Sequence, residues 1–154
     1  MSDLRELYQE LIIDHNRRPR NFYVMEDATQ HMNGFNPLCG DKMTVYLKVK
    51  NNTVEKASFQ GTGCAISMAS ASLMTESLIG KTVEEAETIF QTFHTLMTGA
   101  CDTSSHNHLG KLNVLSGVRD YPARVKCATL AWHAMHAALS NEHPDSVTTE
   151  SLNE

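Results

Sequence analysis

The sequence predicts an α+β fold in which helices pack on one face of a three-stranded antiparallel sheet. Apolar and polar residues alternate with period two on both sides of the Asn51-Asn52 pair, as in a β-hairpin. Apolar residues follow helical spacing before and after this region. A block of strands followed by a block of helices is typical of α+β domains, and 154 residues fit one domain.

The first helix and the sheet are expected in the N-terminal half. An apolar stripe marks the helix, which must end by Pro19 because proline lacks an amide hydrogen. The first hairpin strand follows in residues 42–50, and the second runs from Val54 to the "GTG" segment at 61–63. A third strand is expected near residues 31–35, alongside the hairpin.

Helices dominate the second half. Residues 64–80 form an Ala- and Ser-rich helix that Gly80 can end, and Thr82 with Glu85 makes a capping box for the next helix. Residues 98–110 are expected to form a loop, and Pro122 opens the last helix. The sequence thus predicts one domain over residues 1–140 and a disordered acidic tail over residues 141–154.

The overall composition argues against several classes of function. The formal net charge of −5 argues against a nucleic-acid partner, which normally requires a surplus of Lys and Arg. No apolar run approaches the length of a membrane span, and the N-terminus has no apolar signal-peptide region. We therefore expect a cytoplasmic protein, in which cysteines are metal ligands, catalysts or core residues rather than disulfides.

Three of the four cysteines lie in related structural contexts, and two of them, Cys39 and Cys64, are expected at the same edge of the sheet because a hairpin returns its exit near its entrance. Cys39 lies in the turn that enters the hairpin, Cys64 follows its second strand at a helix N-terminus, and Cys127 lies in the first turns of the last helix. Asp41 can reach the same point. Three thiolates and a carboxylate suit tetrahedral Zn²⁺, and a helix N-terminus stabilises a thiolate.

The residues alone leave other interpretations open. Cysteine is often a small buried apolar side chain, so the metal site and plain core packing both remain possible at this stage. Cys101 lies in the predicted loop with no partner nearby in the sequence, and His106 and His108 of the same loop are weak candidates for metal ligands. Arg124 and Lys126, beside Cys127, can offset the negative charge of such a site.

Three segments in this order resemble the U-type iron–sulfur cluster assembly proteins, the family of IscU and the NifU N-terminal domain. They are "NPLCGD" (36–41), "GTGCAISMASASLMTE" (61–76) and "YPARVKCATLAW" (121–132). The resemblance begins at "DHNRRPRN" (14–21), covers most of the chain, and is strongest to the SufU branch. The family fold, a three-stranded antiparallel sheet with helices against it, agrees with the fold expected from periodicity.

The resemblance implies that Cys39, Asp41, Cys64 and Cys127 are metal ligands. Two features depart from the scaffold branch: Lys126 replaces a histidine before the third cysteine, and "YPARVK" replaces a Pro-Pro-Val-Lys segment. Residues 98–118 resemble an additional segment of SufU proteins. The ligand set is expected to bind Zn²⁺, or alternatively iron or an iron–sulfur cluster.

The implied function is that of a zinc-dependent sulfurtransferase, an enzyme-like role. Such a protein accepts persulfide sulfur from a pyridoxal-phosphate-dependent cysteine desulfurase of the SufS type and passes it to downstream cluster-assembly scaffold proteins. Cys39 is the expected nucleophile because it lies in a turn, and Arg124 is expected to help dock the desulfurase or neutralise the site. The alternatives are a scaffold that assembles and transfers an iron–sulfur cluster, and a purely structural zinc site.

Overall fold

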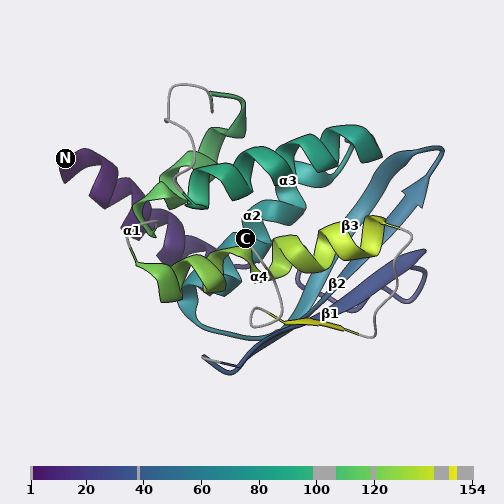
Figure 1. The fold of residues 1–154 in the computed structure, drawn as a ribbon, viewed down its shortest axis with the longest axis horizontal. Helices are drawn as coiled ribbons and strands as arrows, with labels where there is room; N and C mark the ends of the chain where they lie inside the picture. The colour runs from purple at the N-terminus through teal and green to yellow at the C-terminus, as the bar shows by residue number, and fades with distance from the viewer. Residues whose placement is uncertain (1, 38, 99–106, 119–120, 141–145, 149–154) are drawn as a thin grey trace.

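The computed structural model describes residues 2–37, 39–98, 107–118, 121–140 and 146–148. Its elements confirm the predicted α+β organisation, with a helix, a block of strands and then mainly helices (Figure 1). In chain order they are α1 (Ser2–Arg17), β1 (Gln30–Asn36), β2 (Asp41–Lys50), β3 (Thr53–Thr62), α2 (Ala65–Leu78), α3 (Val83–Thr98), the 3-10 helix η2 (Asn107–Val118), α4 (Pro122–Leu139) and β4 (Ser146–Thr148).

The sheet has the strand order β3-β2-β1-β4, and its first three strands in that order are antiparallel, as predicted. Asn51 and Asn52 join β2 to β3 with φ values of 55° and 63°. Asparagine tolerates this left-handed conformation, which matches the twist of a hairpin. The hairpin therefore turns where the sequence predicted.

β4 is an addition that the sequence did not predict. It runs parallel to β1, with Val147 opposite Gly34, inside the segment for which we expected no regular structure. The pairing joins distant parts of the chain, so no local pattern indicates it. The rest of residues 141–154 lies outside the described part of the chain, and the limits of the predicted domain stay a prediction.

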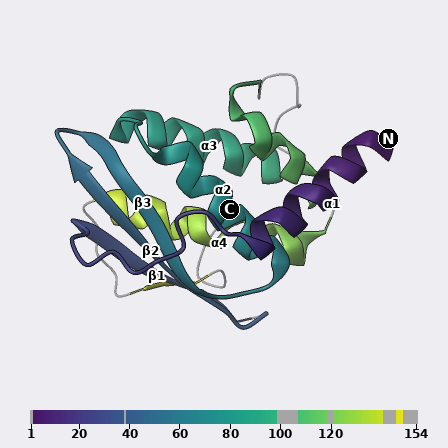
Figure 2. The same cartoon turned by 180° about the vertical axis from the view of Figure 1, so that it is seen from behind.

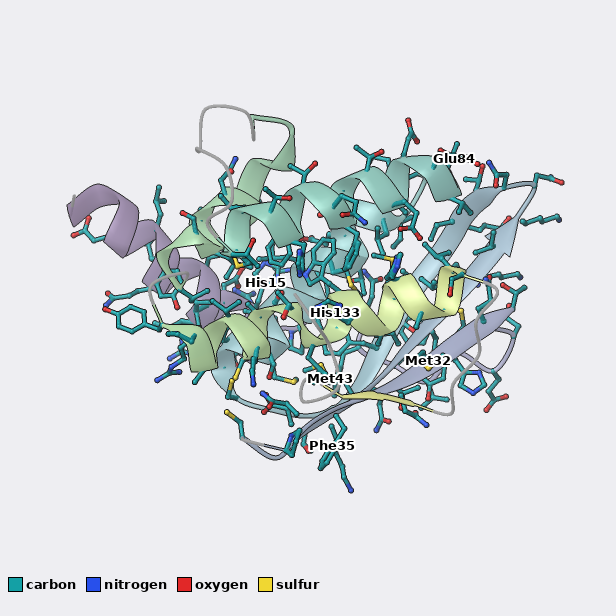
Figure 3. The ribbon with its side chains drawn as sticks, in the orientation of Figure 1. His15, Met32, Phe35, Met43, Glu84 and His133 are labelled. Carbon is teal, nitrogen blue, oxygen red and sulfur yellow. The ribbon has the colours of Figure 1, made fainter. Side chains whose placement is uncertain are left out.

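α2 and α4 cover one face of the sheet (Figures 1 and 2). Met43, on β2, points from the sheet toward α4, whereas Phe35 points away on the opposite face (Figure 3). Trp132 of α4 is fully buried, and its indole Nε1–H donates to Ser70 Oγ of α2 at 3.0 Å. This hydrogen bond holds the two helices together inside the core and helps fix α4 above the sheet.

α1 and α3 form an outer layer, with α1 against α2, α3 against α4, and η2 in contact with both (Figure 2). The predicted capping box opens α3: Glu85 N–H donates to Thr82 Oγ1 at 3.1 Å, and Thr82 N–H donates to Glu85 Oε1 at 2.9 Å. None of the described helices is long and apolar enough to cross a membrane.

Candidate metal centre

Cys39 and Asp41 are positioned by the turn that joins β1 to β2. Asn36, the last residue of β1, pairs with Asp41, the first residue of β2. Gly40 has a φ of 75°, and its N–H donates to the carbonyl of Asn36 at 2.8 Å. Glycine adopts this left-handed conformation without a steric penalty. The tight turn leaves Cys39 exposed, while Asp41 is only 1% exposed.

Cys64 follows β3, whose end pairs with the start of β2, and it is the N-cap residue of α2. Its backbone N–H donates to Asp41 Oδ1 at 2.9 Å, and Ser67 Oγ donates to Cys64 Sγ at 3.6 Å. A Cβ atom at Gly63 would collide with Ser67 Oγ and lie 3.3 Å from Asp41 Oδ1. The glycine therefore lets the start of β2 and the start of α2 approach each other directly.

Cys127 enters the same site from α4 and is 1% exposed. Its Sγ lies 3.5 Å from Cys39 Sγ, and the ligand atoms of Cys39, Asp41 and Cys127 all lie within 4.8 Å of one another. Cys64 is not part of this group among the described residues, although its thiol and that of Cys127 influence each other's pKa. The structure thus brings three of the four predicted ligands together and places Cys64 beside them, and the role of all four as ligands stays a prediction.

The hydrogen bond between Cys64 and Cys127 makes the two thiols unequal. That bond is the main reason why the pKa of Cys64 falls to about 5, and donors from Ser67 add to the effect against burial and the Asp41 charge. The same bond, followed by burial, raises the pKa of Cys127 above its ordinary value. In the metal-free site Cys64 therefore loses its proton at a lower pH than Cys127 does, and metal binding would release the protons that remain on the ligand thiols.

Sequence reasoning missed Asn36 and Ser67. Asn36 is fully buried, and its Nδ2 donates to Asp41 Oδ2 at 3.3 Å and to Cys127 Sγ at 3.6 Å. One signal was available: Asn36 continues the inward-facing positions of β1 after Met32 and Gly34, and a polar residue on the apolar face of a strand indicates a specific partner.

The other predicted residues lie at the margin of the site or outside the described part. Arg124 is exposed in the first turn of α4, and its charge acts on the Tyr8 hydroxyl, opposing the burial that raises the pKa of Tyr8. Cys64 acts on Tyr8 as well and raises the same pKa. The side chains of Cys101, His106 and His108 lie outside the described residues.

Comparison with known proteins places this geometry in a family. The NifU-like N terminal domain model matches residues 7–128. The chain is 41% identical over 142 residues to the zinc-dependent sulfurtransferase SufU of Bacillus subtilis (strain 168), covering 92% of this chain and 95% of the relative. It is 36% identical over 139 residues to the iron–sulfur cluster assembly scaffold protein IscU of Streptococcus pyogenes serotype M1, covering 90% and 86%.

A solved structure agrees with these similarities. FiSufU of Fervidobacterium islandicum AW-1, described as a candidate scaffold protein for the SUF system, superposes with a TM-score of 0.77 at 32% identity. The match covers 88% of this chain and 98% of that protein. The chain therefore belongs to the NifU-like N-terminal domain family, with SufU-type and IscU-type proteins among its relatives.

Proposed function

We propose that this protein is a zinc-dependent sulfurtransferase of iron–sulfur cluster assembly, which accepts persulfide sulfur from a cysteine desulfurase and passes it on. The observation that carries the proposal is the position of Cys39. Its thiol is exposed yet lies 3.5 Å from the buried Cys127 Sγ, so it can serve both as a ligand and as a group that a partner protein reaches. The similarity to a sulfurtransferase along 92% of the chain supports the same function.

The donor set fits Zn²⁺. Cys39, Cys64 and Cys127 supply three sulfur atoms and Asp41 one carboxylate, which are ligand types that zinc accepts in four-coordinate sites. Cys64 lies beside the other three side chains, because its backbone N–H donates to Asp41 Oδ1 at 2.9 Å. Bound zinc would keep the thiolates deprotonated at neutral pH and moderate their reactivity.

The transfer step follows from thiol exchange chemistry. The Cys39 thiolate attacks the outer sulfur of the desulfurase persulfide and forms a new sulfur–sulfur bond. The bond between the two persulfide sulfurs breaks, and the desulfurase cysteine leaves as a thiolate. Cys39 then carries the persulfide, and the same exchange with an acceptor thiol releases it. The outer sulfur moves between thiols without an external oxidant or reductant.

Arg124 is proposed to assist the encounter. Three thiolates, one carboxylate and Zn²⁺ sum to a charge of about −2. An exposed guanidinium in the first turn of α4 can offset part of this charge or bind an acidic group of the desulfurase. A SufS-type desulfurase, downstream scaffold proteins as acceptors and a cytoplasmic location complete the proposal.

A scaffold function is the second candidate, because the same three thiols suit an iron–sulfur cluster and the relatives include IscU proteins. Lys126 bears on the choice. A scaffold benefits from a further ligand beside Cys127, and a lysine ammonium cannot ligate a metal ion while it is protonated.

The test is a sulfur-transfer assay with a SufS-type desulfurase, in which mass spectrometry locates the persulfide. We expect Cys39→Ser to abolish both the stimulation of the desulfurase and the persulfide on this chain. Cys101→Ser is the matched control, because it removes a thiol that we do not assign to the site. Full stimulation by the Cys39→Ser variant would contradict the proposed function.

A further inference from the structure

Asn36 occupies the junction between the turn that carries Cys39 and the helix that carries Cys127. We propose that Asn36 is a positioning residue that holds Asp41 and Cys127 in place as metal ligands while a partner reaches Cys39, the nucleophile of the proposed function. The inference rests on the metal centre of the proposed function and extends it to the choice among the three thiols.

Asn36 connects two elements through separate parts of the residue. Its backbone carbonyl accepts the Gly40 N–H at 2.8 Å, which closes the turn around Cys39. Its side-chain Nδ2 donates to Asp41 Oδ2 at 3.3 Å in the adjacent strand and to Cys127 Sγ at 3.6 Å in α4. Because Asn36 is fully buried, water cannot easily replace these donors.

The contacts fix the orientation of the Asp41 carboxylate. Asp41 Oδ2 accepts from Asn36, and Asp41 Oδ1 accepts from the Cys64 N–H at 2.9 Å. A carboxylate oxygen has two lone pairs, so an oxygen that accepts one hydrogen bond can still ligate a metal ion. Outer partners of this kind orient ligands, and their loss typically lowers metal affinity about 10- to 100-fold.

The three thiols differ in their exposure and in the hydrogen-bond donors that they receive. Cys127 is 1% exposed and accepts from Asn36, and Cys64 accepts from Ser67 Oγ at 3.6 Å. Hydrogen-bond donors stabilise a thiolate and reduce its tendency to attack. Cys39 is exposed, and its Sγ contacts the Cys127 Sγ. Cys39, the exposed thiol, thus lies next to Asp41 and Cys127, the two side chains that Asn36 holds in place.

The test compares Asn36→Ala and Asn36→Leu with Asn33→Ala. The control lies on the same strand, where Asn33 Oδ1 accepts a hydrogen bond from Thr44 Oγ1 at 2.7 Å outside the metal centre. Zinc affinity is measured by chelator competition. Alkylation of each cysteine in the zinc-loaded protein is followed by mass spectrometry, and thermal unfolding of the metal-free protein shows whether each variant folds.

We expect both Asn36 variants to lose about 10- to 100-fold in zinc affinity. We also expect labelling of Cys127 relative to Cys39 to rise at least about fivefold, with the labelling of Cys64 unchanged and Asn33→Ala within about twofold of the wild type. Asn36→Ser, which retains a donor in a smaller side chain, is expected to fold and to show an intermediate loss in affinity.

Two results would overturn the inference. One is an unchanged zinc affinity and labelling pattern in a folded Asn36 variant. The other is an equal rise at all three thiols together with a lower melting temperature in every Asn36 variant, which indicates a purely structural role. Zinc uptake by the wild type separates the two proposals, since a wild-type chain that binds no zinc contradicts the proposed function itself.

Discussion

Two regions of this protein gather side chains that can bind metals, and they are built differently. At the edge of the sheet, Cys39, Asp41 and Cys127 bring their ligand atoms within 4.8 Å of one another. On α3 and α4, the rings of three histidines, among them His133 of α4 (Figure 3), pack against Phe90, and Glu87 contacts one of them, His136. Among the described residues, only the first region has three such atoms so close together.

The two regions differ in the hydrogen bonds that orient their side chains. In the candidate metal centre, the buried Asn36 side chain donates to Asp41 and Cys127, and the Cys64 N–H donates to Asp41, which orients these two groups. On the helices, His136 stacks on Phe90 with ring centroids 4.5 Å apart and its Nδ1 lies 2.7 Å from Glu87 Oε1. Its polar atom thus already has a partner on α3. Ligand-type residues make a metal site only where the fold aims their donor atoms together.

The largest expected effect is on zinc affinity, which should fall when a residue of the sheet-edge region is replaced and stay the same when a residue of the helical region is replaced. Asp41→Ala and Cys127→Ser should each lower the affinity for Zn²⁺ by more than about 100-fold, because each removes or replaces a ligand of the proposed site. His133→Ala should change it by less than about twofold. Chelator competition measures all three. An equal loss in the His133 variant would show that the helical cluster contributes to zinc binding.

The next effect concerns stability, and here the helical region should dominate. Phe90 is 5% exposed and supports all three rings, so Phe90→Ala should lower the free energy of unfolding of the metal-free protein by about 3–5 kcal/mol. Urea unfolding measures the loss. Phe22→Ala is the control, because Phe22 is 40% exposed and should cost less. An equal loss for both variants would contradict the structural role of Phe90.

His15 lies outside both regions, and its burial predicts how the stability of the protein depends on pH. His15 is fully buried with its Nδ1 2.6 Å from Ser72 Oγ, and burial, assisted by Arg20, lowers the pKa of His15 from its ordinary 6.5. The folded state therefore binds fewer protons than the unfolded state just below pH 6.5. Stability attributable to His15 should be present above this pH and decline as the pH falls toward the lowered pKa.

His15→Gln should remove that part of the pH dependence. The measurement is urea unfolding of wild type and variant between about pH 7 and pH 5.5, since other groups cancel in the difference. His31→Gln, at an exposed position on β1, should keep the wild-type slope. A His15→Gln variant with the same slope as the wild type would show that this burial does not influence the acid response.

The smallest effect is expected for the ion pair of the helical region. Glu87 and His136 have side chains 31% and 42% exposed, and solvent-accessible pairs of this kind contribute little. Glu87→Gln should therefore change the free energy of unfolding by less than about 1 kcal/mol and leave zinc affinity unchanged. A large change in either quantity would mean that this pair organises more of the molecule than its contacts indicate.

Local patterns were sufficient for most of the fold. Period-two alternation predicted the hairpin, Asn51 and Asn52 its turn, and Pro122 the start of α4, because each depends on neighbouring residues. β4 depends on a pairing with β1 across a long stretch of chain and had no local signal. The same limit explains why residue patterns alone did not place η2 against both α1 and α3.

The candidate site was predictable to the extent that the hairpin determines it. The return of β3 beside β2 brings Cys64 to Asp41, which follows from the strand pattern. The approach of Cys127 depends on how α4 crosses the sheet, and there the family resemblance supplied the expectation. The inward-facing position of Asn36 on β1 indicates a buried partner, but which groups Asn36 bonds to depends on side-chain geometry.

The most direct test of the central claim is the metal and acid-labile sulfide content of the full chain purified without added metal. The proposed function predicts about one zinc per chain and no sulfide, because the three thiols and Asp41 would form one tetrahedral site. Iron with a matching amount of sulfide would contradict it and establish the scaffold function instead.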